Sequence, residues 1–131
     1  MKWFKYGVIA MLGFSISACD MNAKSSGYDE VTVAQVQQLI TKNDAPIWVL
    51  DVRTQGEYAS GHVPTAHNIS IDSLSSRLQE VPRDIDVYVY CESGVRSTRA
   101  AEFLVASGYS KVHNMRASMR GWRSADYTIE K

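Results

Sequence analysis

Cysteine is scarce in this chain: its 131 residues contain two, Cys19 and Cys91. A framework of several disulfide bonds is therefore excluded, and a chain of this length allows one domain. The chain also has no formal net charge, because 14 Lys and Arg side chains balance 14 Asp and Glu side chains. The sequence shows no basic stripe with interleaved aromatic residues, so we expect no nucleic-acid partner. Hydrophobic residues make up 45% of the chain, as in an ordinary globular core.

Histidine is scarce too, and it shows no metal-binding pattern. The three histidines are His62, His67 and His113, and their spacing matches no dense ligand motif. We therefore expect no metal ion, and we also expect no organic cofactor. Internal repeats and low-complexity runs are also missing.

The first residues have the pattern of a secretory signal peptide, which we place at residues 1–18. Met1–Lys5 carries two lysines, and Tyr6–Ile16 is apolar but too short to span a bilayer comfortably. Ile16-Ser17-Ala18-Cys19 resembles the lipobox of bacterial lipoproteins. In that class the chain is cut before the cysteine, which then carries the lipid.

This pattern predicts a lipid anchor on the periplasmic side of a bacterial membrane. Residues 19–29 would form the lipidated N-terminus and a flexible tether, and residues 30–131 the folded domain. Two alternatives remain, an ordinary cleaved signal that releases a soluble periplasmic protein and a retained membrane anchor. If Cys19 is lipidated, Cys91 is left unpaired in an exported protein, which calls for a chemical explanation.

Cys91 lies between a strand pattern and a helix pattern. Val87–Tyr90 is β-branched or aromatic throughout, which suits a buried strand. Arg99–Ser107 predicts a helix. Backbone N–H groups of the intervening loop should point inward without partners and bind an anion. These dipoles, with Arg96 nearby, favour thiolate over thiol at Cys91; the alternative is an inert buried thiol.

The loop is short, because only Glu92, Ser93, Gly94 and Val95 separate Cys91 from Arg96. Cysteine-dependent phosphatases use a related cradle that is one residue longer. A narrower ring of amides suits a guest smaller than phosphate, such as the outer sulfur of a persulfide on Cys91. We expect Gly94 to supply the positive φ that turns the amides inward.

Two motifs resemble those of a known family. Cys91-Glu92-Ser93-Gly94-Val95-Arg96-Ser97 is similar to the active-site loop of single-domain rhodanese-like sulfurtransferases, and Asp51–Ile69 is similar to their N-terminal signature. The resemblance runs from about Tyr28 to Trp122. It implies a rhodanese-like α/β fold, with a central parallel five-stranded sheet flanked by helices on both faces.

The resemblance also implies a thiosulfate sulfurtransferase. The Cys91 thiolate would take the outer sulfur of thiosulfate or a similar donor, and a thiol or cyanide would then accept it from the persulfide. The planar guanidinium of Arg96 would orient the sulfonate, and the loop amides would stabilise negative charge on sulfur. The substrate-binding positions are then Arg96, Glu92, Ser93, Gly94, Val95 and Ser97.

Several charged residues near the two motifs have supporting or alternative roles. We expect Asp51, at a strand end, to brace the cysteine loop by accepting hydrogen bonds, and Arg53 to pair with Glu57 at i and i+4. The carboxylate of Glu92 opposes anion binding, and if it points outward it would favour a less anionic donor. The remaining arginines, Arg116, Arg120 and Arg123, form either a positive rim that steers anions or a solvated face; Arg96 could also be solvated.

One departure from the family concerns the turn after the last strand. The family usually has a glycine pair there, whereas this chain has Ala117 and Ser118. Side chains at these positions would alter the turn and narrow the rim of the pocket.

The rest of the domain alternates strand and helix patterns, which predicts a parallel sheet covered on both faces. Ligands of such sheets bind at the carboxyl ends of the strands. The other predicted strands are Ile47–Leu50, Ala66–Ile69 and Lys111–Met115. The other predicted helices are Thr32–Ile40 and Thr54–Ala59, each with capping-box spacing, Ser73–Gln79 capped by Asp72, and Met119–Ser124 anchored by Trp122.

Two other functions remain open. A cysteine-dependent phosphatase or arsenate reductase is disfavoured by the loop length and by the lack of a second redox cysteine in the mature chain. A persulfide carrier or binding module without its own turnover would need the same persulfide as an enzyme, so the sequence does not separate the two.

Overall fold

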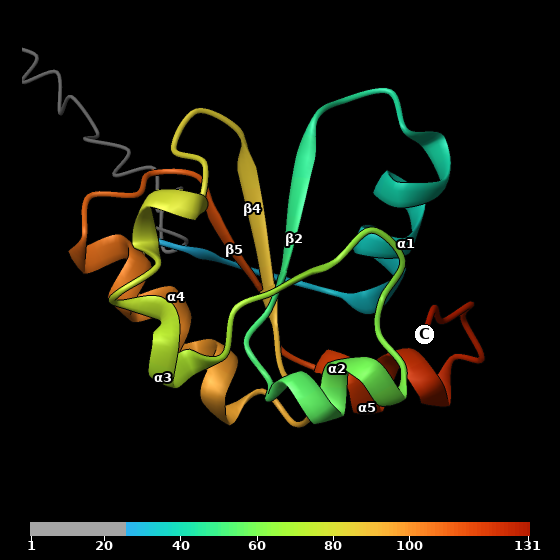
Figure 1. The fold of residues 1–131 in the computed structure, drawn as a ribbon. Coiled ribbons are helices and arrows are strands. Elements are labelled where there is room, and N and C mark those ends of the chain that lie inside the picture. The colour runs from blue at the N-terminus through green and yellow to red at the C-terminus, as the bar shows by residue number, and fades with distance from the viewer. Residues whose placement is uncertain (1–25) are drawn as a thin grey trace, which may run out of the picture.

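The structure is a computed structural model that describes residues 26–131. The predicted signal peptide, Cys19 and most of the predicted tether lie outside the described residues. One parallel sheet has the strand order β1-β5-β4-β2-β3, with helices on both faces (Figure 1). The elements are, in chain order, β1 (Asp29–Val31), α1 (Val33–Lys42), β2 (Ile47–Asp51), α2 (Gln55–Ser60), β3 (His67–Asn68), α3 (Ile71–Leu74), the 3-10 turn η1 (Leu78–Glu80), β4 (Asp86–Tyr90), α4 (Val95–Ala106), β5 (Val112–Met115) and α5 (Ser118–Ser124). The predicted five-stranded α/β fold is confirmed.

Local sequence patterns place most elements correctly. Thr32 and Thr54 form the predicted capping boxes of α1 and α2, in which each threonine hydroxyl accepts a hydrogen bond from the backbone N–H three residues later. The helix predicted at Ser73–Gln79 is wrong. Its first residues belong to α3, its last to η1 and those between form a turn, and Asp72 lies inside α3 and does not cap it.

The fifth strand is β1, which the pattern of the sequence does not reveal. It has three residues and pairs in parallel with β5 at the edge of the sheet. The preceding Tyr28 is buried in the core. The packed domain therefore begins at Tyr28 and Asp29, inside the segment that the sequence assigns to the tether.

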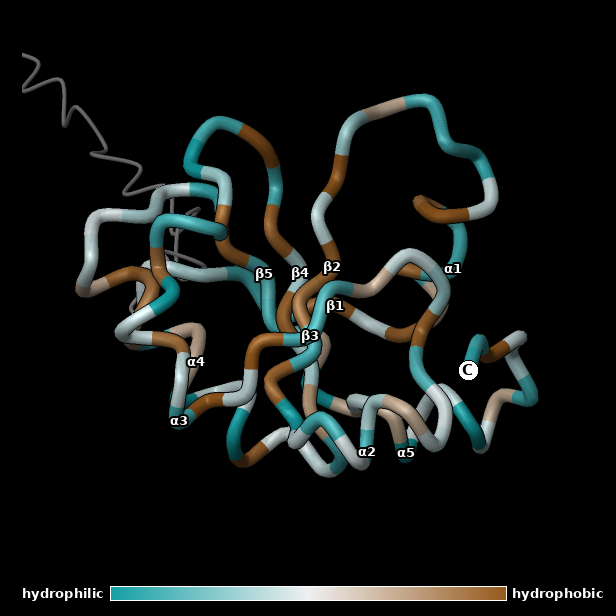
Figure 2. Tube along the Cα trace, viewed as in Figure 1, coloured by the Kyte–Doolittle hydropathy of each residue, from teal (hydrophilic) through white to brown (hydrophobic). Residues whose placement is uncertain are grey.

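Two cores form because successive side chains of a strand point to opposite faces. On β4, Val87 and Val89 face α3 and α4, whereas Tyr88 and Tyr90 face α1 and α5. Figure 2 shows the hydrophobic residues along the central strands and the hydrophilic ones at the outer turns.

None of the helices within residues 26–131 has the length and apolar character that a membrane-spanning helix needs.

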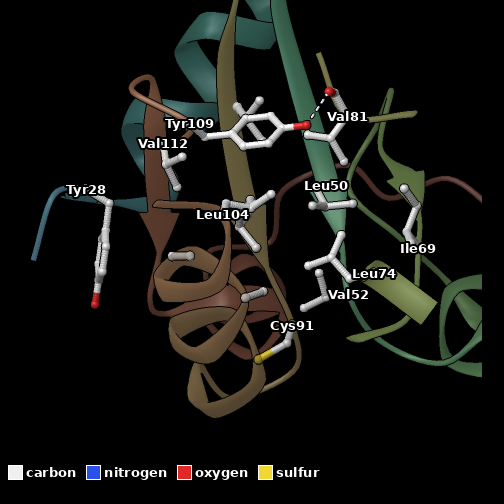
Figure 3. Close-up of a cluster of buried hydrophobic side chains, with 14 residues drawn as sticks. Tyr28, Leu50, Val52, Ile69, Leu74, Val81, Cys91, Leu104, Tyr109 and Val112 are labelled. Atoms are coloured by element: carbon white, nitrogen blue, oxygen red, sulfur yellow. Dashed lines mark hydrogen bonds between the residues drawn. The ribbon is translucent and has the colours of Figure 1, made fainter. Parts of the chain in front are cut away.

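The loops that follow β2 and β4 diverge at the carboxyl ends of these two strands. These strands pair directly, but α2, which follows β2, packs on one face of the sheet through Tyr58, and α4, which follows β4, packs on the other through Leu104. Ligands of parallel sheets bind at such a switch point. Cys91 lies here, at one end of the core cluster that Figure 3 displays.

Candidate active site

The cysteine loop closes onto the sulfur of Cys91. The Gly94 N–H donates a hydrogen bond to Cys91 Sγ over 3.0 Å, and α4 begins at the next residue. Gly94 has φ 99°, as predicted, and a Cβ there would overlap the carbonyl oxygen of Arg116. Only glycine therefore fits the position that aims this amide at the sulfur.

The surroundings of Cys91 favour the thiolate. Burial alone raises the pKa of Cys91, but hydrogen bonds from the backbone and side chain of Ser97, from the Gly94 N–H and from the Ser118 hydroxyl together lower it. Cys91 is fully buried, as an inert thiol would be. An inert thiol in an apolar pocket would stay neutral. The hydrogen-bond donors around the Cys91 sulfur favour the thiolate instead, which argues against an inert thiol.

The start of α5 holds the cysteine loop in place through backbone hydrogen bonds. The Met119 N–H donates to the carbonyl oxygen of Cys91 over 2.9 Å, and the Arg120 N–H donates to that of Glu92 over 3.0 Å. Ser118 is fully buried, with its hydroxyl beside Cys91. The two positions where the family usually has glycines therefore differ, because the Ser118 side chain is buried against Cys91, whereas Ala117 is exposed.

A buried ion pair connects the end of β2 to the same loop. Both carboxylate oxygens of Asp51 accept hydrogen bonds from Arg53, at 2.7–3.1 Å, and Oδ2 also accepts the hydroxyl of Tyr90 at 2.7 Å. Arg53 donates further to the carbonyl oxygen of Gly61. Tyr90 is the residue before Cys91, so this network holds the end of β4 in place, as expected of Asp51.

Arg96 is in the first turn of α4 and forms a bidentate ion pair with Glu57 of α2. The two Nη–Oε distances are 2.7 and 3.0 Å. The hydrogen bonds from Arg96 lower the pKa of Glu57 to about 2. A carboxylate with a lowered pKa stays ionised until the pH falls through that value. The pair is therefore intact at neutral pH, and the charge of Arg96 is compensated.

Comparison with known proteins agrees with this geometry. A family model described as Rhodanese-like domain matches residues 32–125. The chain belongs to the rhodanese-like domain family. A curated sulfurtransferase from Allochromatium vinosum is 37% identical over 76 residues, which cover 58% of this chain and 71% of the relative. Thiosulfate sulfurtransferase GlpE from Actinobacillus pleuropneumoniae is 30% identical over 106 residues, 81% of this chain and 96% of the relative.

Solved structures show the same fold. A rhodanese-related protein from Thermoplasma volcanium superposes with a TM-score of 0.71 at 27% identity, over 79% of this chain and 98% of that one. Some curated relatives are longer, since the chain spans 59% and 52% of two others. The predicted family and fold are therefore confirmed.

One predicted ion pair of the rhodanese-like domain is wrong. Arg53 does not pair with Glu57, because α2 begins at Gln55 and Arg53 lies in the loop before it, where helical i, i+4 spacing does not apply. Arg53 turns instead to Asp51 and, at 3.4 Å, to the carboxylate of Glu92. Glu57 joins Arg96, which is 39 residues away in the chain.

Glu92 is held between two arginines of the rhodanese-like domain. Its carboxylate contacts Arg53 and also accepts a hydrogen bond from Arg123 of α5. The three arginines of the expected rim do not share a helical face, because Arg116 precedes α5. Arg123 is compensated by Glu92, and Arg116 and Arg120 are exposed.

The other loop residues differ in their exposure to solvent. Ser93 is exposed and Val95 is 67% exposed, whereas Ser97 is fully buried and donates from Oγ to the carbonyl oxygen of Gly94. Sequence reasoning missed Tyr90 as the link between Asp51 and the loop. One signal could have indicated this link. Tyr90 carries a hydroxyl, directly precedes the cysteine and lies on the same face of the sheet as the strand-end carboxylate of Asp51. No cluster of three or more potential metal ligands occurs within residues 26–131.

Proposed function

We propose that this rhodanese-like domain is a sulfurtransferase that moves a sulfane sulfur from thiosulfate, or a similar donor, to a thiophilic acceptor through a persulfide on Cys91. The observation that carries the proposal is the convergence of hydrogen-bond donors on Cys91 Sγ, with the Gly94 N–H at 3.0 Å. Membership of a family with curated sulfurtransferases supports the same reaction class.

The reaction consists of two displacements at sulfur. In the first, a lone pair of the Cys91 thiolate attacks the outer sulfur of thiosulfate, the S–S bond of the donor breaks, and its electron pair leaves with sulfite. In the second, a thiol or cyanide attacks the outer sulfur of the persulfide, and the electron pair of the Cys91 S–S bond returns to Sγ. Backbone donors of residues 92–97 stabilise the charge on sulfur in both steps.

Intact mass spectrometry with turnover kinetics tests the proposal. Thiosulfate should add about 32 Da, one sulfur atom, to the protein, and cyanide should remove it repeatedly, as expected of covalent catalysis. An unchanged mass after thiosulfate and after an uncharged sulfane donor would refute it. Hydrolysis of an aryl phosphate would point instead to a phosphatase.

A persulfide carrier is the second candidate. A Bacillus subtilis relative, 31% identical over 75% of this chain, is provisionally named a sulfur carrier protein. A carrier would acquire the same extra sulfur but release it once, to a partner. Many turnovers of thiosulfate and cyanide by the protein alone would establish the enzyme.

We also propose that the domain is held at the periplasmic side of a bacterial membrane by lipid on Cys19. The support is the signal-peptide and lipobox pattern of residues 1–19. The mass of the mature N-terminal peptide tests it. A peptide beginning at Cys19 with attached acyl chains is expected, and an unmodified Cys19 would leave a soluble periplasmic protein.

The Glu57→Gln variant tests how Arg96 takes part. Glutamine keeps an acceptor for the capping box of α2 but removes the charge that compensates Arg96. We expect kcat/KM for thiosulfate to rise about three- to tenfold, because a free guanidinium binds a sulfonate through charge-assisted hydrogen bonds. Steady-state kinetics at neutral pH measure this.

Arg96→Ala is the matched counterpart. It should lower kcat/KM for thiosulfate by about tenfold, while an uncharged thiosulfonate ester still forms the persulfide on Cys91. Equal use of thiosulfate by Arg96→Ala and the natural protein would remove Arg96 from donor binding.

The Glu92→Ala variant tests the influence of the carboxylate on the donor. It frees Arg53 and Arg123 from their shared partner, so the surroundings of the cysteine loop become more positive. We expect KM for thiosulfate to fall about two- to fivefold at low ionic strength, with the difference shrinking as salt screens it. An unchanged KM would show that Glu92 does not influence the choice of donor.

A further inference from the structure

Ser118 has a backbone conformation that serine rarely adopts. Its φ is +57°, in the left-handed region where a Cβ is unfavourable and glycine is not. The side chain is nevertheless fully buried. A strained, buried residue persists only where its surroundings hold it, and such residues gather at functional sites. The contacts of its hydroxyl therefore need an explanation.

Three groups surround the Ser118 hydroxyl. Its oxygen accepts a hydrogen bond from the Cys91 N–H at 3.2 Å. Its own proton has two acceptors within reach, the carbonyl oxygen of Met115 at 3.0 Å and Cys91 Sγ at 3.8 Å. A hydroxyl carries one proton that rotates to suit its acceptors, so the acceptor with more negative charge receives it.

We infer that the Ser118 hydroxyl is a switchable hydrogen-bond donor to the reacting sulfur, donating to Cys91 Sγ in the sulfur-free thiolate and to Met115 when Sγ carries an extra sulfur. The thiolate part rests on these contacts and on the charge of the thiolate, and the persulfide part rests on the proposed function. In a persulfide the negative charge lies on the outer sulfur, and Sγ becomes a weak acceptor.

This arrangement favours release of the sulfur. When an acceptor attacks the outer sulfur, the electron pair of the breaking S–S bond moves onto Sγ, where the charge then develops. Ser118 stabilises that charge, and a thiol of lower pKa is the better leaving group in such exchange. The Ser118 hydroxyl therefore assists the second displacement together with the Gly94 N–H, which also donates to Sγ.

The positive charges near Cys91 are compensated by carboxylates, so they are not the main stabilisation of the thiolate. Arg96 of α4 interacts electrostatically with Cys91, but Glu57 of α2 compensates it. From the end of β2, Arg53 is compensated by Asp51 and by Glu92 of the cysteine loop. Hydrogen bonds to Sγ therefore carry much of the preference for the thiolate, and the Ser118 hydroxyl contributes to the lowered pKa of Cys91.

Two variants separate the hydroxyl from the strain. Ser118→Ala removes the hydroxyl and keeps the Cβ, whereas Ser118→Gly removes both and relieves the backbone, so it should fold even if the alanine variant does not. Ser107→Ala is the matched control, since its hydroxyl donates to the Phe103 carbonyl oxygen at the end of α4. Ultraviolet titration of thiolate absorbance in the full chain, corrected with the Cys91→Ser protein, reports the pKa.

Both Ser118 variants should raise the pKa of Cys91 by about one unit, the effect of one hydrogen bond to a charged group, and Ser107→Ala should not. An unchanged pKa in Ser118→Gly overturns the inference. This measurement involves no sulfur donor, so it stands even if no persulfide forms.

The second arm follows discharge of the preloaded persulfide by cyanide in a single turnover. The Ser118 variants should discharge about three- to tenfold more slowly because their leaving thiol has a higher pKa. Discharge at the natural rate with a raised pKa refutes the switch. Failure of the natural protein to load any sulfur would refute the proposed function instead.

Discussion

Replacing Cys91 with serine should abolish sulfur transfer and eliminate the mass increase that thiosulfate produces. A serine hydroxyl does not ionise near neutral pH, so the variant has no nucleophile that attacks sulfur. Serine is close in size to cysteine, and the Gly94 N–H that donates to Sγ can donate to a hydroxyl. The fold should therefore survive, which circular dichroism and thermal unfolding will check.

Cys19→Ser is the matched control, because it changes the other cysteine of the chain and leaves the cysteine loop intact. It should keep both the added sulfur and the turnover. If the sulfur adduct persists in Cys91→Ser, or is lost in Cys19→Ser, our proposal assigns the chemistry to the wrong cysteine. Because the pKa of Cys91 is lowered, loading should persist to a lower pH than it would with a free cysteine. It should decline as the pH falls through the lowered pKa, since the thiolate is then protonated.

The Asp51→Asn variant should be strongly destabilised. The change leaves the guanidinium of Arg53, whose side chain is 1% exposed, without its main counter-charge. Breaking a buried pair from one side costs about 3–5 kcal/mol of unfolding free energy, a large fraction of the total for a small domain. Urea unfolding at neutral pH measures this loss. Sulfur transfer should fall as well, because Tyr90 and the cysteine loop lose their support.

Two controls show whether the cost comes from the unpaired charge. Combining Asp51→Asn with Arg53→Met should recover part of the stability, since replacing both partners leaves no buried charge. Glu80→Gln breaks the exposed pair of Glu80 with Arg77, and its urea midpoint should match that of the natural protein. A double variant no more stable than Asp51→Asn would show that the network acts through its hydrogen bonds rather than through charge.

Predictions from the sequence were most accurate where one turn of backbone decides the conformation. The capping boxes at Thr32 and Thr54 and the positive φ of Gly94 involve residues a few positions apart. Prediction was less accurate for β1, because a three-residue edge strand depends on its partner β5. The same limit applies to the helix expected at Ser73–Gln79, which the packed chain divides into two short pieces.

The charged residues show what spacing does not reveal. A pairing of Arg53 with Glu57 follows from i, i+4 spacing, but that rule needs both residues on one helix, and α2 begins after Arg53. Ser118 was noticeable in the sequence because glycine is usual there in the family. Its burial against Cys91 was not predictable, since it depends on how α5 meets the loop.

The sequence by itself determined the strand, loop and helix that hold Cys91 and the glycine that turns an amide toward its sulfur. These features depend on φ and ψ preferences of adjacent residues. Only the tertiary structure decided which partners the charges and hydroxyls have: Arg96 with Glu57, Arg53 with Asp51 and Glu92, and Ser118 with Cys91. Most of these contacts join residues far apart in the chain, which the order of the parallel strands brings to one edge of the sheet.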